Sequence, residues 1–496
     1  MNLDLLRPEI CLAVTAVVII AVDLLCRHKW LVTVVSIAGL LASVGLALSL
    51  VGNTSNLNAL SIGNGLFVLD RYAVYFKLLF AGITFLIILA SVGYIQRLPK
   101  LHGEFHALIL TATLGAMLTA AAHDIISILL SIELTAISLY ALVAMLKNDK
   151  SSESAVKYIL LGAVNSAVML FGFALVFGFS GSTSLTGIAQ AISGTQIGNV
   201  ADNAGLLFGL VLILAGLAFK IAAVPFHMWT PDVYEGAPAP ITLLLSTISK
   251  IAGFSILMRF MFVLFTQVNS PTNNFGVILA IISATTMIVG NLLAIRQQNI
   301  KRLLAYSSIA QSGYILMAIA AHATNAYSGI FFINYDQRIS SFLYYLAVFA
   351  IAEVAVFTVI IIASQKTDVD NISDYAGLAK RSPTLACAMT LGLLSLMGLP
   401  PLAGFAGKVF IFSSVATQSN LIWLVIVAVL ASVISAYYYL RIIRTIWMDA
   451  PASTDNIKFS LSPKLVLFIA CSSILLIGIL PTILMEITDF ARIVIH

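Results

Sequence analysis

Charged side chains are scarce in this sequence. Asp, Glu, Lys and Arg make up 9% of the 496 residues and hydrophobic residues make up 60%, whereas ordinary soluble domains carry about 25% charged residues. A chain with a mean hydropathy of +1.04 cannot cover a water-facing surface with polar groups. The composition excludes a soluble domain and predicts a membrane protein.

Cysteine is rare as well. The four cysteines (Cys11, Cys26, Cys387 and Cys471) lie far apart, without the CxxC or Cys/His spacing of zinc and iron–sulfur sites. The stretch GFAGK (404–408) lacks the following Ser or Thr of a phosphate-binding loop. We therefore expect no metal or cofactor in this chain. Its basic residues are scattered, which argues against a nucleic acid partner.

Apolar runs long enough to cross a bilayer follow one another along the whole chain. We predict an all-α polytopic membrane protein with about fourteen transmembrane helices, at 8–25, 31–51, 72–95, 106–122, 124–146, 155–180, 206–229, 239–265, 275–295, 303–321, 342–364, 384–418, 421–446 and 462–486. The longest polar stretches, 181–205 and 365–383, are expected to be loops. The first run has acidic flanks and no cleavage site, so we expect a retained span rather than a signal peptide.

The basic residues predict an orientation. Most of the 26 Lys and Arg residues fall in the odd-numbered connections, such as 147–157 and 296–302. Cytoplasmic loops are enriched in these residues. We therefore expect both termini on the non-cytoplasmic side, which an even number of spans requires.

Two spans contain helix breakers at corresponding places. Span seven is interrupted by AAVPFH (222–227) and span twelve by GLPPLAG (398–404), and proline leaves backbone groups that hydrocarbon cannot satisfy. We predict two inverted five-helix repeats, each with one broken helix. The units are 1–105 (three spans), 106–265 (first repeat), 275–446 (second repeat) and 447–496 (last span).

Five charged residues lie near the middle of predicted spans: Glu133, Lys220, Lys250, Glu353 and Lys408. Each is about ten residues from its span ends, so at 1.5 Å per residue it lies roughly 15 Å deep. A charge at that depth costs about 2.5–3.5 kcal/mol on insertion scales. We interpret the set as a lateral chain of protonatable groups near the membrane midplane. The alternative is a set of static ion pairs that lock helices together.

Three further groups are candidates for a secondary role in a proton path. His227 follows the first break and could relay protons, or be an interface residue with a hydrogen bond. His322, at the outer end of span ten, is a candidate exit group. Asp124 precedes span five and could instead favour the helix dipole there.

Other charged residues receive structural interpretations. Glu9, Asp23 and Arg259 are expected to reach toward the interface or to contact partners. Asp232 and Glu235 are expected to shape the loop between spans seven and eight.

Several stretches together resemble a known family. LAFKIAAVPFHMWTPDVYEGAPAPITLLLSTISKIAGF (217–254) resembles the signature region of the antiporter-like, proton-translocating membrane subunits of NADH-quinone oxidoreductase (respiratory complex I). SIELTAISLYAL (131–142), IKRLLAYSSIAQSGYIL (300–316) and GLPPLAGFAGKVFIF (398–412) are similar to further parts of it. PDVYEGAP (231–238) and the opening RPEICLAV (7–14) resemble the subunit N type.

The resemblance implies roles for individual residues. It makes Glu133 the acid of span five, Lys220 and Lys250 the lysines of spans seven and eight, and Lys408 the lysine of broken span twelve. Glu353 matches no motif position of the family, so its role rests on depth alone.

The resemblance also implies a setting. The chain would be a translocase subunit without a redox centre, in an energy-transducing inner (plasma) membrane. NADH, FMN, iron–sulfur clusters and quinone are expected in partner subunits. Its partners would be the lipid bilayer and other membrane subunits, especially neighbouring antiporter-like and small ones.

Two alternatives remain open at this point. The same groups would serve a subunit of a multisubunit cation/proton antiporter or of a membrane-bound hydrogenase. The chain could also be a purely structural membrane-arm subunit, whose buried charges bind it to its neighbours.

Overall fold

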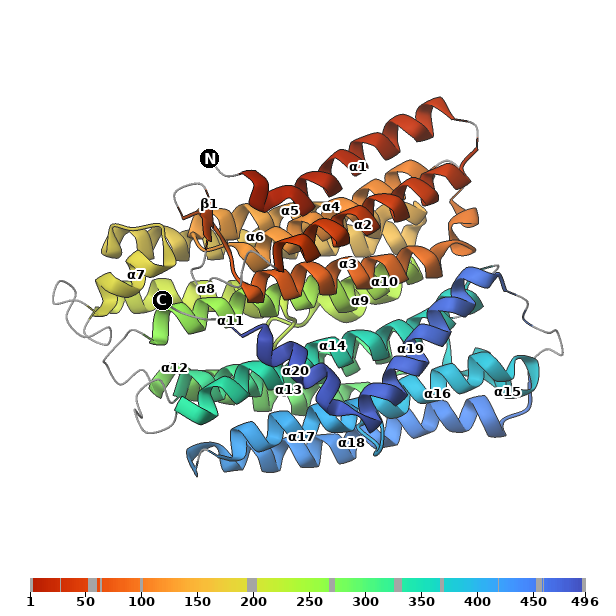
Figure 1. Cartoon of the computed structure of the whole chain (residues 1–496). Coiled ribbons are helices and arrows are strands. Elements are labelled where there is room, and N and C mark those ends of the chain that lie inside the picture. Colours follow the sequence, from red (N-terminus) through yellow and green to blue (C-terminus); the bar gives the residue numbers. More distant parts are fainter. Residues whose placement is uncertain are drawn as a thin grey trace.

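The protein folds into a bundle of long helices (Figure 1). The structure is a computed structural model, and it describes residues 3–26, 28–51, 60–62, 65–98, 101–193, 203–266, 273–324, 332–365, 370–417, 419–451, 457 and 459–492. Within these residues, twelve helical runs are long and apolar enough to cross a membrane. The all-α membrane fold is therefore confirmed.

The long helices are α1 (Arg7–Leu25), α2 (Trp30–Val51), α3 (Arg71–Ser91), α4 (His102–Ala121), α5 (Ile125–Val143), α6 (Asp149–Ser180), α11 (Lys250–Thr266), α12 (Asn273–Ile295), α13 (Ile300–Thr324), α14 (Phe332–Ala363), α18 (Ile422–Met448) and α19 (Leu461–Ile479). The shorter α-helices are α7 (Leu185–Ser193), α8 (Ala204–Lys220), α9 (Trp229–Gly236), α10 (Ala239–Leu244), α15 (Leu378–Arg381), α16 (Pro383–Met397), α17 (Ala403–Ala416) and α20 (Pro481–Phe490). Short helical segments of other types are η1 (Leu3–Leu6), η3 (Tyr94–Arg97), η4 (Ala144–Leu146), η6 (Leu245–Ser249), η7 (Ile372–Tyr375) and η8 (Ser419–Leu421).

The two predicted breaks are present. The chain leaves helical geometry between α8 and α9, directly after Lys220, and again between α16 and α17, at 398–402. With each of these two spans counted as one interrupted crossing, the helices account for the fourteen predicted spans. The correspondence of spans four to eight with spans nine to thirteen as inverted repeats stays a prediction.

The most deeply buried helices lie between the two broken spans. The run from α10 through η6 to α11, together with α13 and α14, has 89–100% of its most apolar window buried, whereas α1, α18 and α19 have 28–33%. Figure 1 shows α1 and α2 at one edge of the bundle, α17 and α18 at the other, and α13 and α14 between them. Charges on the central helices are therefore shielded by protein on all sides.

Three details differ from the sequence prediction. The stretch 181–205 is not only loop, because it contains α7, and 365–383 contains η7 and α15. The last span does not continue to 486, since α19 ends at Ile479 and α20 begins at Pro481. Proline fits the first turn of a helix but interrupts one that is already running.

A small hairpin closes one end of the bundle. Strands β1 (Leu60–Ile62) and β2 (Phe67–Leu69) pair antiparallel, and Phe67 forms a bridge to Ala122 at the end of α4. Backbone polar groups outside the spans thus find partners in the protein.

Two buried charges that were expected to reach toward the interface or to contact partners form ion pairs inside the protein. Arg259 on α11 donates to both carboxylate oxygens of Asp70, at 2.8 and 3.0 Å, and Glu9 on α1 lies 2.7 Å from the ammonium of Lys77 on α3. A long side chain in the middle of a bundle has a closer partner on a neighbouring helix than in water. Asp23 pairs with Lys29 across the α1–α2 connection.

The opposite end of the bundle carries an ion-pair network. Asp232 and Glu235 lie on α9 rather than in a loop, and both bind Arg302 at the start of α13, at 2.7 and 2.9 Å. Lys157 on α6 also binds Asp232, and Lys150 binds Glu235. These acids therefore join α6, α9 and α13, whereas from the sequence they were expected to shape a loop.

Candidate functional site

The first broken helix ends at Lys220. Trp229, the first residue of α9, fixes this end by stacking near Phe219 and donating from its indole N–H to the Phe219 carbonyl at 3.1 Å. Tyr158 of α6 stacks on the other side of the Trp229 ring, with centroids 4.7 Å apart. The break is therefore filled by aromatic side chains that hold Lys220 in place.

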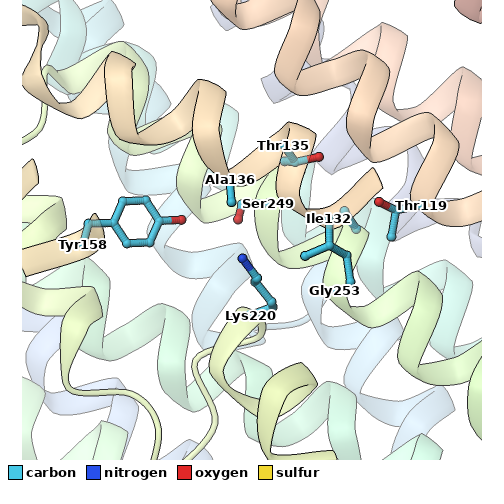
Figure 2. Close-up of a pocket in the computed structure, with 9 residues that line it drawn as sticks. Thr119, Ile132, Thr135, Ala136, Tyr158, Lys220, Ser249 and Gly253 are labelled. Atoms are coloured by element: carbon cyan, nitrogen blue, oxygen red, sulfur yellow. The ribbon is translucent and has the colours of Figure 1, made fainter. Parts of the chain in front are cut away.

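The ammonium group of Lys220 points into a small cavity (Figure 2). The cavity measures about 10 Å³, and its polar lining comes from Thr119 and Thr135, Tyr158 and Ser249. Within the part of the chain that the structure describes, the Lys220 Nζ has no hydrogen-bond partner. A polar space of this size holds roughly one water molecule, which would supply the missing bond.

A glycine permits α11 to approach this lysine. A Cβ on Gly253 would lie 3.0 Å from the Ile221 side chain and 3.3 Å from the Cβ of Lys220. Because Gly253 has no side chain, α11 lies against the end of α8. Lys250 stands one helical turn before Gly253 on that same helix.

Glu133 lies beside the same cavity on α5. Its neighbour Ile132 lines the cavity, and its own carboxylate accepts a hydrogen bond from Ser166 of α6. It interacts electrostatically with Lys220, although the two form no ion pair among the contacts of the described residues. Glu133 is half-buried, near the outer faces of α5 and α6.

Lys250 follows a local change in helix geometry. The five residues of η6 form a π-helical turn directly before it, a feature that frequently occurs at functional sites. The Lys250 Nζ donates to the Ser308 hydroxyl of α13 at 2.8 Å and lies 5.9 Å above the Tyr234 ring. The side chain is 1% exposed.

Glu353 on α14 is the acid whose charge acts on Lys250. It is fully buried, and Lys250 and Ser246 are the groups that face its carboxylate. Neither carboxylate oxygen makes a hydrogen bond of good geometry within the described residues. A buried carboxylate with open oxygens beside a lysine can accept a proton. Glu353 was selected from the sequence by its depth alone, and the structure places it near Lys250.

A row of polar side chains on α13 connects Lys250 with the second break. We call Ser307, Ser308, Gln311 and Tyr314 the polar face of α13. Gln311 donates to the Leu396 carbonyl at the end of α16, at 3.0 Å, and accepts from the Tyr345 hydroxyl at 2.5 Å. Ser307 is hydrogen-bonded to Tyr439.

Lys408 sits at the second break. Its Nζ donates to the Met397 carbonyl at 2.8 Å and to the Ser432 hydroxyl at 2.9 Å, and lies 4.7 Å above the Tyr314 ring. Met397 is the last residue of α16, so the broken helix supplies the oxygen that binds the lysine. The neighbouring carbonyl, that of Leu396, is the one held by Gln311.

The three secondary candidates occupy different places. His227 lies in the first break but does not line the cavity of Lys220. His322 is buried near the end of α13, where it stacks on Phe262 with centroids 5.2 Å apart. Asp124 caps α5, accepting from the Ile126 N–H at 2.8 Å within a capping box.

Sequence reasoning missed the polar face of α13 as part of the site. Its signal was present, because Ser307, Gln311 and Tyr314 recur at helical spacing in an otherwise apolar span. Neutral polar side chains cost less to bury than charges, so they stand out less from the sequence.

The described residues contain no group of three or more His, Cys, Asp or Glu side chains that could hold a metal ion. All four cysteines are free thiols. The site described above is built from lysines, carboxylates and hydroxyls, which are groups that exchange protons.

Comparison with known proteins places this arrangement in a family. Residues 122–435, which contain all five midplane charges, match the family described as "NADH:quinone oxidoreductase/Mrp antiporter, TM". The chain belongs to this family. A curated member, NADH-quinone oxidoreductase subunit N of Dehalococcoides mccartyi, is 42% identical over 497 residues and matches 100% of each chain.

Solved structures agree with the family fold. A chain of respiratory complex I from Thermus thermophilus with bound aureothin superposes with a TM-score of 0.78 at 28% identity, covering 97% of this chain and 99% of that one. A chain of the membrane-bound sulfane sulfur reductase, an archaeal respiratory membrane complex, gives a TM-score of 0.86 at 26% identity, covering 99% and 97%. The same fold thus occurs in more than one respiratory membrane complex.

Proposed function

We propose that this chain is a non-redox, proton-translocating subunit of a NADH-quinone oxidoreductase of the complex I type. The proposal is supported by full-length similarity to subunit N of that enzyme and by the buried groups at the two breaks. Quinone reduction and the NADH, FMN and iron–sulfur chemistry would belong to partner subunits, and this chain would convert that reaction into proton movement.

One observation carries the proposal. Each broken helix presents a buried lysine, and the two lysines have opposite surroundings. Lys220 faces a water-sized cavity without a direct partner, whereas Lys408 is held by a helix-end carbonyl and a hydroxyl. Static ion pairs would bind each lysine directly to a carboxylate, and neither lysine forms such a pair among the described residues. A proton path needs one group with access to water and another group whose protonated form is stabilised by hydrogen bonds.

The proposed path runs from Glu133 to Lys408. A proton arriving by way of the cavity water binds the amine of Lys220, and the charge of Glu133 favours the ammonium form. Ser249 lines that cavity and precedes Lys250 in the chain, so two ammonium groups here would repel each other. Protonation of Lys220 therefore favours release of a proton by Lys250, to the carboxylate of Glu353 or along the polar face of α13.

The polar face of α13 would carry the proton to the second break. Hydroxyl groups accept one proton as they release another, so Ser308, Tyr439 and Tyr345 can pass a proton along hydrogen bonds and intervening water. Gln311 orients this segment and holds the end of α16. Lys408 would receive the proton, with the Met397 carbonyl and the Tyr314 ring stabilising its ammonium form.

The energetic demand is modest. Moving one charge against 100 mV costs about 2.3 kcal/mol. Loss of one charge-assisted hydrogen bond changes the balance by about 1.5–3 kcal/mol. Rearranging the partners of one lysine is therefore sufficient to drive a step. His322, on the same helix as Ser308, would serve as an exit group, and His227 would be a relay between the first break and water.

The placement in the membrane is also proposed. The network end, with Lys150 and Arg302, would face the cytoplasm, and both chain termini would face the other side of an energy-transducing inner (plasma) membrane. Neighbouring antiporter-like and small membrane subunits would contact the outer faces, one of them near Glu133.

Replacing Lys408 tests the proposal. Vesicles that contain the assembled complex with Lys408→Ala should show quinone reduction with fewer protons moved per quinone, while Lys157→Ala, at the network end, should leave the ratio unchanged. An unchanged ratio in the Lys408→Ala complex would contradict the proposed path. Loss of assembly in a Lys408→Arg complex, which keeps the charge, would instead favour a structural role.

A further inference from the structure

A large groove lies on the outer surface between α16 and α19, away from the lysine path. Its volume is about 950 Å³. One wall is a single face of α16, with Thr384, Ala388 and Leu391 at helical spacing. The other wall is the matching face of α19, with Lys464, Phe468 and Cys471.

The two walls run in the same direction. Both α16 and α19 begin at the end of the bundle where α15 lies (Figure 1). The groove is therefore polar at one end, where the two helices start, and apolar further along toward Leu391 and Leu467. This order matches an amphipathic molecule standing with its head at the membrane surface.

The polar end is positively charged. Lys380, Arg381 and Lys464 line it, together with the hydroxyls of Ser382 and Thr384. Lys380 and Lys464 are exposed, and no carboxylate of the described residues forms an ion pair with either of them. The first turn of α16 adds backbone N–H groups that its own helix leaves open.

The basic residues of the ion-pair network at this end behave differently. Lys150, Lys301 and Arg302 are each bound to an acid at 2.7–3.3 Å. The positive charges of the network are thus balanced by carboxylates, whereas Lys380 and Lys464 at the groove have no such partner among the described residues. Two lysines without a carboxylate partner at one end of an apolar groove are complementary to a lipid with an anionic headgroup and acyl chains.

We propose that this groove binds an anionic phospholipid of the membrane. Its phosphate lies between Lys380 and Lys464, with Arg381, Ser382 and Thr384 beside it, and its acyl chains lie against Leu391, Leu467 and Phe468. Basic pockets between transmembrane helices bind such headgroups. Phe468 is 73% exposed, so the apolar part opens toward the lipid phase, as this occupant requires.

The lipid would contact both α16, which leads to the Lys408 site, and α19, a peripheral helix. α16 ends at Met397, whose carbonyl binds Lys408, whereas α19 is one of the least buried spans. A phospholipid seated between them fixes the first half of the broken span against a peripheral helix.

Photocrosslinking to the assembled, detergent-purified complex tests this inference. The probe is phosphatidylglycerol with a diazirine in one acyl chain, and phosphatidylcholine with the same diazirine is the matched neutral probe. Peptides from 383–391 and 461–471 should be labelled by phosphatidylglycerol, and unlabelled phosphatidylglycerol should compete better than phosphatidylcholine. Lys380→Gln and Lys464→Gln should each weaken competition about fivefold.

Lys147→Gln is the matched control, because Lys147 is exposed and outside the groove. It should leave labelling unchanged. The proposal is overturned if both probes label the groove equally, if the Lys147 and Lys380 variants behave alike, or if neither probe labels these peptides. Because the wild-type comparison of the two probes needs no variant, a failure of assembly does not obscure the result.

Discussion

At the residue scale, depth in the span identified the buried charges but could not assign their partners. Lys220 and Lys408 follow the same sequence pattern, a lysine beside a helix break. In the structure one faces a small cavity and the other binds a carbonyl and a hydroxyl. Such partners come from other helices, and periodicity within one span carries no information about them.

The five midplane candidates were selected from the sequence, whereas Gln311 was not. A glutamine in a span is compatible with many positions, and only the end of α16 makes this one distinctive. For Glu9 and Arg259 the sequence left open whether they reach the interface or contact partners, and it did not identify Lys77 and Asp70 as their partners.

Gln311→Leu should impair proton movement. The change removes the bonds to the Leu396 carbonyl and to the Tyr345 hydroxyl. Leaving one such buried group unsatisfied costs about 1–3 kcal/mol. We expect fewer protons moved per quinone reduced with the complex still assembled. Gln297→Leu is the control, because Gln297 lies just past the end of α12 and its amide donates to the Leu293 carbonyl in an exposed position. Equal pumping by both variants would remove Gln311 from the path.

At the element scale, helix breakers were the most informative sequence signal. The prolines of AAVPFH and GLPPLAG located both interruptions, because proline cannot supply the missing backbone bond. The same signal was overlooked at Pro481, where α20 begins. α7 was missed because its nine residues are too few to show a span-like pattern.

Gly398→Ala should disturb the second break. Gly398 ends α16 with a φ of +87°, and an added Cβ would lie 2.9 Å from the Cδ of Lys408. Backbone strain and displacement of the lysine should both reduce pumping. Gly178→Ala is the matched control, since a Cβ there meets nothing within 4 Å. Normal pumping by the Gly398 variant would show that the position of Lys408 is not critical.

At the scale of the whole molecule, the network end joins the two halves of the chain. Lys150 of the first half and Lys301 of the second both bind Asp370, at 3.3 and 2.9 Å. Hydrophobic periodicity predicts which spans exist, but such contacts depend on how the spans assemble. The sequence therefore predicted the number of spans, but it did not predict the ion pairs that join the two halves of the chain.

Acid should weaken this junction. Burial alone would raise the pKa of Asp370, but Lys301 and Lys150 together lower it below its ordinary value. A depressed pKa stabilises the folded state above the unfolded pKa, and the contribution is lost as pH falls through the folded one. Thermal stability of the complex should thus fall below about pH 4, and Asp370→Asn should reduce that dependence.

Asp449→Asn is the control for this measurement, because Asp449 ends α18 outside the network. Its acid profile should match that of the unmodified complex. If the Asp370 and Asp449 variants respond to acid in the same way, the junction does not depend on the charge of Asp370.

The most direct test of the central claim is the number of protons moved per quinone reduced by vesicles containing the assembled complex with Lys220→Ala. The account predicts continued quinone reduction with a lower proton ratio, because the ammonium group that faces the cavity at the first break has been removed. A ratio equal to that of the unmodified complex would contradict the account and leave Lys220 a structural residue of the broken helix.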